Sequence, residues 1–332
     1  MCKTIMKVLI LGGTNFIGVE IVSLLLDKGL EVTCYTRGNK KINRNASHIK
    51  GDRNNQSLLK KAAMNDYDIV IDNIGFSGED VNLTIDVFKG RLKHYILTST
   101  AGVYLSGKQS PFFEGNNPID PNTLQVPDFE HKSYVIGKIE AEWALFNQKL
   151  VPFTIIRPPV VIGPNDPTMR FDFYIKRILD GGPILITDCG KNRFSLAYSK
   201  DLAFAYYQVI CQQDVTFGKA YNICNLGSID LLNLLREAAN SMKKKLTTVN
   251  ISNKQSQLLG ASYFNPMASK NMFFNNFITM PNRACAEINY KPLQIEEAIS
   301  QTAKWHASEP FVESWHYTSR EKELQIASKY QE

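Results

Sequence analysis

Residues 7–18 read KVLILGGTNFIG, and this stretch decides the fold of the 332-residue chain. Val8 to Leu11 is a continuous apolar run, typical of a strand buried on both faces. Two glycines end the run, apolar residues follow at helical spacing from Ile17 to Leu25, and Gly29 stands where a C-terminal cap belongs. A strand, a glycine turn and a helix in this order predict an anion-binding turn, because the start of a helix presents free N–H groups and partial positive charge.

The glycine motif is Gly12-x-x-Asn15-x-x-Gly18. Gly12 permits a tight turn, and Gly18 permits close packing of the helix on the strand. Asn15 stands where glycine is usual, but asparagine is among the few other residues that tolerate a left-handed backbone. We therefore predict a dinucleotide-binding turn; a strand–helix turn without a ligand is the alternative.

A chain of 332 residues is long enough for a large core and two lobes. Its composition, with 44% hydrophobic and 21% charged residues, is that of a globular protein. No run of about 18 apolar residues predicts a membrane span. The first residues faintly resemble a signal peptide, but their apolar part runs directly into the glycine turn and is interpreted as the first strand. The formal charge of +6 permits an anionic ligand and does not by itself imply nucleic acid.

Cysteine and histidine usage argues against disulfides and metals. The cysteines form no CxxC pair, which favours reduced thiols in the cytoplasm. The five histidines show no metal-ligand spacing. The six cysteines are Cys2, Cys34, Cys189, Cys211, Cys224 and Cys285.

Predicted strands and helices alternate over the first hundred residues. This order favours an α/β fold with a parallel sheet covered by helices on both faces, whose ligands bind at the carboxyl ends of the strands. The glycine turn and three further stretches converge there, namely Thr36-Arg37, Asn73 to Gly75 and Thr98 to Thr100. Strands are expected at 31–35, 48–52, 68–72, 94–99, 153–157 and 220–224, and helices at 55–64, 79–88, from about 133, 172–179, 200–212, 231–242 and 294–305.

The end of the second strand bears on the choice of cofactor. An acid there bonds the ribose 2′-hydroxyl of NAD, whereas an arginine accommodates the 2′-phosphate of NADP. This chain has Thr36 and Arg37, followed by Lys40, Lys41 and Arg44, and no acid before Asp52. We predict a slight preference for NADP over NAD; a solvated basic loop is the alternative.

A second motif, YVIGK, spans Tyr134 to Lys138. Residues four apart share one face of a helix, and an ammonium group lowers the cost of a phenolate. The tyrosine is therefore a candidate acid and base, with a surface helix pair as the alternative. Its context supports catalysis, because Thr98, Ser99 and Thr100 end the strand before it and offer a hydroxyl to the reacting oxygen.

The sequence resembles the extended short-chain dehydrogenase/reductase family of nucleotide-sugar epimerases and dehydratases. Within that family it is most similar to the branch that includes the chloroplast stem-loop-binding proteins. The resemblance implies a Rossmann-type doubly wound sheet at residues 1–164 and about 195–225. It also implies a smaller substrate lobe at about 165–194 and 226–318, and a tail at 319–332. The stretches that carry it are VLILGGTNFIG, HIKGD, DIVIDNIG, LTSTAGVY, YVIGK, IIRPPVVIGPND and RFSLAYSKDLA.

The resemblance implies a role for each matching residue. Tyr134 would be the acid/base, Lys138 its partner and nicotinamide-ribose ligand, and Thr100 the catalytic hydroxyl at the substrate. Arg193 would hold the substrate phosphates, and Asp52 would bond the adenine amino group. The implied cofactor contacts are Gly12, Thr14, Asn15, Phe16, Ile17, Gly18, Thr36, Arg37, Asp52, Asn73, Ile74, Gly75, Thr98, Lys138, Pro158 and Val160.

Departures from the family pattern limit the reaction. Dehydratases carry an Asp-Glu pair after the catalytic threonine, and here those places hold Ala101 and Gly102, which have no proton to move. Epimerisation through a keto-sugar intermediate, ketone reduction and alcohol oxidation remain. An RNA-binding protein or a cofactor-bound protein without turnover is the alternative of another class.

The resemblance also implies a homodimer formed through two helices of each subunit, at 79–88 and 134–146. Their apolar residues would serve that interface or the core equally well. These residues are Val81, Ile85, Val135, Ile139 and Trp143.

Overall fold

The computed structural model describes residues 5–106, 110–115, 119–123, 131–187, 190–252, 254–255, 276–310 and 320–330. The chain divides into two compact units, each built from three segments. Unit 1 comprises Met1–Pro159, Ser199–Cys224 and Thr279–Pro292, and unit 2 comprises Val160–Tyr198, Asn225–Ile278 and Leu293–Glu332.

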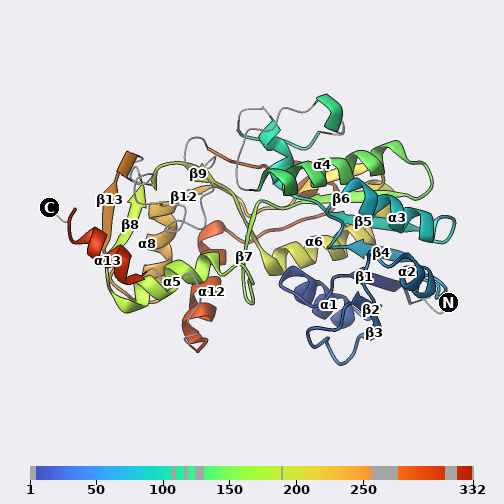
Figure 1. The fold of residues 1–332 in the computed structure, drawn as a ribbon, viewed down its shortest axis with the longest axis horizontal. Helices are drawn as coiled ribbons and strands as arrows, with labels where there is room; N and C mark the ends of the chain where they lie inside the picture. The colour runs from blue at the N-terminus through green and yellow to red at the C-terminus, as the bar shows by residue number, and fades with distance from the viewer. Residues whose placement is uncertain are drawn as a thin grey trace. The chain divides into compact units, whose positions relative to one another are not determined.

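Unit 1 contains a seven-stranded parallel sheet in the order β11-β6-β5-β4-β1-β2-β3 (Figure 1). The order reverses between β1 and β4, so that the loops after these two strands diverge and leave room for a ligand. The strands are β1 Lys7–Leu11, β2 Glu31–Thr36, β3 Ser47–Lys50, β4 Ile69–Asp72, β5 His94–Thr98, β6 Phe153–Arg157 and β11 Lys219–Asn222.

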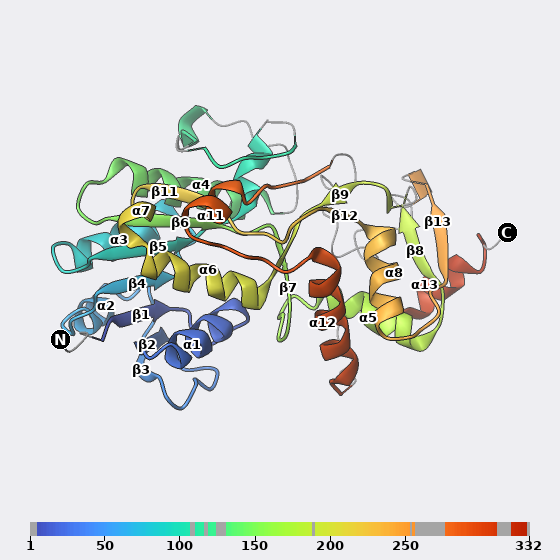
Figure 2. The same cartoon turned by 180° about the vertical axis from the view of Figure 1, so that it is seen from behind.

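Helices cover both faces of this sheet (Figures 1 and 2). One face carries α1 Ile17–Asp27 and α6 Ser199–Cys211, which pack against each other. The other face carries α2 Gln56–Ala62, α3 Gly78–Phe88 and α4 Lys132–Asn147. The prediction of a doubly wound parallel sheet is confirmed. Short elements complete the unit: η1 Ala101–Ser106, η2 Pro121–Thr123, α7 Gln213–Thr216 and α11 Asn282–Glu287.

The core explains why the strands read as unbroken apolar runs. Leu9 and Leu11 join the cluster that includes residues of α2, α3 and α4, and the alternate residues Val8 and Ile10 are also fully buried. Such strands alternate their side chains between two covered faces. Val81, Ile85, Val135 and Ile139 are buried in this unit, so they serve its core rather than a dimer interface.

The described part of unit 2 contains short paired strands and several helices. The helices α5 Arg170–Asp180, α8 Leu231–Ser241 and α12 Ile295–Ser308 pack together. The strands were not predicted, because a run of two to four residues carries too little periodicity. The pairs are β7 Val160–Ile162 with β10 Leu196–Tyr198, β9 Arg193–Phe194 with β12 Ile229–Asp230, and β8 Ile184–Thr187 with β13 Thr248–Ile251.

Several segments differ from the expected domain boundaries, since unit 1 ends at Pro159 instead of 164 and resumes at Ser199 instead of about 195. Residues 279–292 return to unit 1, where they carry α11. The expected tail contains a helix, α13 Arg320–Ala327, whose Glu323 is fully buried and pairs with Arg177 at 2.6 Å. Among the described helices, none combines the length and apolarity needed to cross a bilayer.

Candidate active site

The glycine turn follows β1 and precedes α1. Gly12 has a φ of 88°, and a Cβ there would lie 2.7 Å from Cγ2 of Ile74. A Cβ on Gly18 would collide with the carbonyl oxygen of Gly12. Both glycines are therefore required for the turn and for the close approach of α1 to it.

The left-handed residue of the turn is Phe16, not Asn15. Phe16 has a φ of 42° and precedes α1 at its N-cap position without a side-chain capping bond. Asn15 keeps a negative φ, and its carbonyl accepts the N–H of Gly18 at 2.9 Å. The tolerance of asparagine for a left-handed backbone is therefore not used at position 15. Its exposed side chain accepts a hydrogen bond from Nζ of Lys40 at 2.6 Å instead.

The end of β2 presents one buried and one exposed residue. Thr36 is buried, and its Oγ1 lies 3.0 Å from Nε2 of His48 and accepts the N–H of Gly38 at 3.3 Å. Arg37 is exposed next to it. Asp52, after β3, is exposed and its carboxylate accepts the N–H of Asn54 at 3.0 Å.

A buried carboxylate at the end of β4 is a residue that sequence reasoning missed. Nη1 of Arg53 donates to both carboxylate oxygens of Asp72, at 2.9 and 3.0 Å. The hydroxyl of Tyr95 donates to the same carboxylate at 2.6 Å. The N–H of Ile74 donates to the same carboxylate at 3.0 Å. Burial first, and then the charge of Asp72, raise the pKa of Tyr95. Asp72 therefore fixes the loop that begins at Asn73, directly beside Gly12.

Asn73 lies between the glycine turn and β5. Its N–H donates to the carbonyl of Leu11 at 3.0 Å, and its Oδ1 accepts from the hydroxyl of Thr98 at 2.5 Å. The hydroxyl of Tyr206, on α6, lies 2.6 Å from Thr98 Oγ1, and burial raises the pKa of that tyrosine. The Nδ2 group of Asn73 is buried without a partner in the structure. Sequence reasoning missed Tyr206, which no motif marks.

Lys138 is buried to 1% exposure at the centre of the site. Its Nζ donates to the carbonyl oxygens of Thr98 at 2.6 Å and Gly75 at 2.8 Å. The same group lies 5.8 Å from the centre of the Tyr134 ring and 4.7 Å from that of Phe76. Burial lowers the pKa of Lys138 to about 8. The predicted pair is thus brought together at the ends of β4 and β5.

Tyr134 is 41% exposed in the first turn of α4, and its ring centre lies 6.2 Å from that of Phe76. The helix approaches the loop after β4 closely, because a Cβ on Gly137 would collide with the carbonyl oxygen of Phe76. Thr100 lies at the start of η1, where its Oγ1 accepts the N–H of Gly102 at 3.1 Å. That bond uses an oxygen lone pair and leaves the hydroxyl proton of Thr100 for donation.

A buried ionic network lies beneath these residues, and sequence reasoning missed its carboxylate. Glu142, one turn after Lys138, accepts from Ser99 Oγ at 2.5 Å and from Arg157 Nε and Nη2 at 2.9 and 2.5 Å. Arg157 also donates to the hydroxyl of Tyr104 at 3.0 Å. The sequence signal was an acid on the inward face of α4. The network joins α4 to the carboxyl ends of β5 and β6.

Of three further predicted residues, one serves the backbone of unit 1 and two belong to unit 2. The carbonyl of Pro158 accepts the N–H of Ala101 at 2.8 Å. Val160 begins β7 in unit 2. Arg193, also in unit 2, donates from Nε to Ser228 Oγ at 3.0 Å and lies 3.7 Å from Asp230. These contacts hold Arg193 within its own unit.

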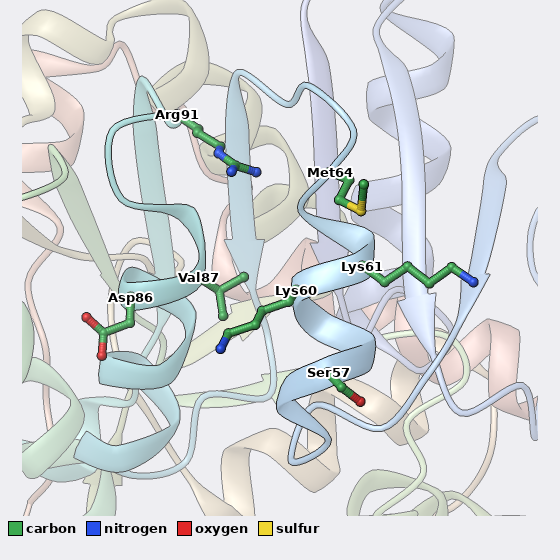
Figure 3. Close-up of a pocket in the computed structure, with 7 residues that line it drawn as sticks. All are labelled: Ser57, Lys60, Lys61, Met64, Asp86, Val87 and Arg91. Atoms are coloured by element: carbon green, nitrogen blue, oxygen red, sulfur yellow. The ribbon is translucent and has the colours of Figure 1, made fainter.

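A surface groove lies between α2 and α3 (Figure 3). Met64 and Arg91 follow these helices and precede β4 and β5, so the groove lies toward the amino ends of the strands, opposite the glycine turn. It is therefore separate from the candidate active site. In the part of the chain that the structure describes, no group of three metal-ligating side chains occurs. The groove is lined by Ser57, Lys60, Lys61, Met64, Asp86, Val87 and Arg91.

The sequence profile of the NAD dependent epimerase/dehydratase family matches residues 8–224. The chain belongs to this family. The matched region runs from β1 through β11 and includes the glycine turn, Lys138 and Tyr134. The resemblance predicted from the motifs is thereby confirmed, and the family is that of an NAD-dependent enzyme.

A relative is the chloroplast stem-loop binding protein of 41 kDa b of Arabidopsis thaliana. It is 31% identical over 220 residues, which are 61% of this chain. The matched region spans 55% of the length of that relative.

Solved structures of epimerases and a dehydratase share the fold. A dTDP-glucose 4,6-dehydratase of Bacillus anthracis in complex with NAD is 16% identical, with a TM-score of 0.70 over 92% of this chain and 97% of that one. A UDP-glucuronic acid 4-epimerase of Bacillus cereus in complex with NAD is 18% identical, with a TM-score of 0.69 over 91% and 99%. A UDP-glucose 4-epimerase of Thermotoga maritima with UDP-glucose is 18% identical, with a TM-score of 0.68 over the same shares.

Proposed function

We propose that the protein is an NAD(P)-dependent epimerase acting on a nucleotide-activated sugar through a keto-sugar intermediate. A ketone reductase with the same residues is the alternative. The observation that carries the proposal is the buried ammonium group of Lys138 beside Tyr134, next to the glycine turn. Structures of similar fold include enzymes named for nucleotide sugars, which supports this substrate class.

The residues at the turn fit a dinucleotide. Gly12 and Gly18 leave no room for a Cβ, and the start of α1 has no side-chain cap, so its N–H groups suit a pyrophosphate. The buried Nδ2 of Asn73 supplies a further donor, which has no partner among the residues that the structure describes. When bound, a nicotinamide ring exchanges hydride with the substrate carbon. Lys138 would hold the adjoining ribose.

Tyr134 would remove a proton from a sugar hydroxyl and return it to the carbonyl oxygen. Its exposed position leaves its hydroxyl within reach of a substrate, and the nearby Lys138 charge stabilises the phenolate that forms. Thr100 would donate its hydroxyl proton to the developing oxyanion, since Gly102 occupies only its lone pair.

Elimination of water is not part of the proposal. Ala101 is buried and apolar, and Gly102 has no side chain, so neither position after Thr100 supplies an acid or a base. Without a second proton-transfer pair, the site supports transfer at one carbon. This leaves inversion of a hydroxyl group, reduction of a ketone or oxidation of an alcohol.

NADP remains the cofactor that the second strand favours, although the family is NAD-dependent and the similar structures named above contain NAD. Arg37 is exposed at the strand end, and no acid lies between Glu31 and Asp52. A guanidinium group in this place suits a 2′-phosphate.

Identification of the nucleotide that co-purifies with the protein tests the proposal. Mass spectrometry of the denatured protein is combined with titrations of NAD and NADP. Tightly retained NAD supports an epimerase that recycles its cofactor and contradicts the preference for NADP. An empty site that binds NADP better supports a reductase. Failure to bind either dinucleotide refutes the proposal that the protein is a dinucleotide-dependent enzyme.

RNA binding is the second candidate, because the Arabidopsis relative is named for stem-loop binding. The groove between α2 and α3 carries Lys60, Lys61 and Arg91, which suits a phosphate backbone. Titration with an RNA stem-loop at several salt concentrations tests this candidate. Affinity that falls steeply with salt and is lost in Lys60→Ala and Lys61→Ala supports it, whereas no measurable affinity at low salt excludes it.

The cytoplasm is the proposed compartment, supported by the free thiols at Cys34, Cys211, Cys224 and Cys285.

A homodimer is the proposed assembly. Since the expected apolar residues of α3 and α4 are mostly buried in the core, its interface would use other side chains. Sedimentation equilibrium measures the mass that decides this.

A further inference from the structure

A lysine from the loop after β2 reaches the glycine turn. Lys40 Nζ donates to Oδ1 of Asn15 at 2.6 Å, and both side chains are exposed. Asn15 occupies the central place of the glycine motif, immediately before the first residues of α1. The contact therefore holds an ammonium group beside the start of that helix.

The start of α1 is an electrostatically unfavourable place for the Lys40 ammonium group unless an anion binds there. The start of α1 carries the positive end of the helix dipole, which repels Lys40. The loop offers no compensation, because residues 32–51 contain five lysines and arginines and no acid. The first-turn acid of α1, Glu20, interacts with Lys200. Positive charge thus accumulates at the turn.

We propose that Lys40 is a cofactor-binding residue that donates to the pyrophosphate common to NAD and NADP, and that Asn15 is its positioning residue. This inference rests on the proposed dinucleotide site. An ammonium group has three N–H donors, and the bond to Asn15 uses one of them. The remaining donors and the helix start would face the same dianion.

The proposal explains the departure from glycine. A glycine at the centre of the motif lets the backbone approach the pyrophosphate. The side chain of Asn15 presents an acceptor oxygen there, which by itself repels phosphate oxygens. Lys40 occupies that acceptor with one N–H group, which removes the repulsion. Its other N–H groups then offer charge-assisted hydrogen bonds to the phosphate.

Calorimetric titration of NAD and NADP into Lys40→Ala tests the inference. We expect both dissociation constants to rise by about 2-fold to 5-fold, the usual range for an exposed charged contact. The dependence of NAD affinity on salt should weaken as well, because one cationic contact is lost. Lys89→Ala, which removes an exposed lysine at the end of α3, is the matched control and should change neither value.

Asn15→Ala separates the two roles. We expect it to weaken binding by a smaller factor, and the double variant to bind no more weakly than Lys40→Ala alone, since Asn15 acts through Lys40. A loss confined to NADP would assign Lys40 to the 2′-phosphate and overturn the inference. So would equal affinities of Lys40→Ala and Lys89→Ala. If the wild-type protein binds neither dinucleotide, the proposed function itself fails.

Discussion

The ammonium group of Lys138 lies 5.8 Å from the centre of the Tyr134 ring, yet the two side chains experience opposite environments. Lys138 is 1% exposed and bonded to two backbone carbonyls, whereas Tyr134 is 41% exposed. A fixed, dry charge thus acts on a phenol that is open to a ligand. Such an arrangement strengthens the electrostatic effect of the lysine, because little water screens it.

Tyr134→Phe should abolish turnover and leave dinucleotide binding within about 2-fold. The change removes only the hydroxyl that transfers the proton, and the ring keeps its contact with Phe76. Steady-state kinetics and calorimetric titration of the same preparation measure the two effects. Activity equal to that of the wild type would refute the assigned role.

Thr100→Ala should lower kcat about 10-fold or more, because an oxyanion donor is lost. It should also destabilise the protein by about 1 kcal/mol, since the hydroxyl caps the N–H of Gly102. Thr100→Ser keeps the donor and is expected to retain most of the rate. If Thr100→Ala works at wild-type speed, Ser99 or another group is the donor.

Lys138 should make stability rise with pH above pH 8. Burial lowers its pKa from 10.5 to about 8, so between these values the unfolded chain holds more protons than the folded one. Urea unfolding from pH 7 to pH 10 compares the wild type with Lys138→Met. From pH 7 to pH 10, the free energy of unfolding of the wild type should increase by about 2 kcal/mol relative to that of the variant. A constant difference would contradict the lowered pKa.

Arg37→Ala should weaken NADP binding about 10-fold and NAD binding by less than 2-fold, because only NADP carries the 2′-phosphate. Titration of both nucleotides into wild type and variant gives the ratio directly. Equal weakening would remove the reason to prefer NADP.

Glu142→Ala should destabilise unit 1 by about 3–5 kcal/mol, because it leaves the buried guanidinium of Arg157 without its carboxylate. Glu140→Ala, two residues earlier on α4, is the control and should cost less than about 1 kcal/mol. Chemical denaturation of both variants provides the comparison. Equal midpoints for the two would show that the buried pair adds little.

The motifs near the strand ends were predictable from sequence because each obeys a local rule. The turn at Gly12, the strands from β1 to β6 and the spacing of Tyr134 and Lys138 depend on periodicity and on contacts within one helix or one turn. The prediction of Thr100 came from the family resemblance, because no local sequence pattern marks this residue as part of the site.

Long-range pairing explains what sequence reasoning missed. Asp72 and Arg53 are 19 residues apart, and Glu142 and Arg157 are 15 apart, so no helical or strand period connects them. Thr98 meets Tyr206 over 108 residues. The bond between Asn15 and Lys40 was not predicted either, because the two residues are 25 apart in the sequence.

The order of the strands also has a consequence for synthesis on the ribosome. Strand β11 pairs with β6, although the 39 residues of the first segment of unit 2, Val160–Tyr198, and then α6 and α7 are translated between them. A nascent chain that ends before Lys219 therefore exposes the edge of β6 and lacks the last parallel neighbour of the sheet. The seven-stranded sheet is therefore complete only when Asn222 has left the exit tunnel.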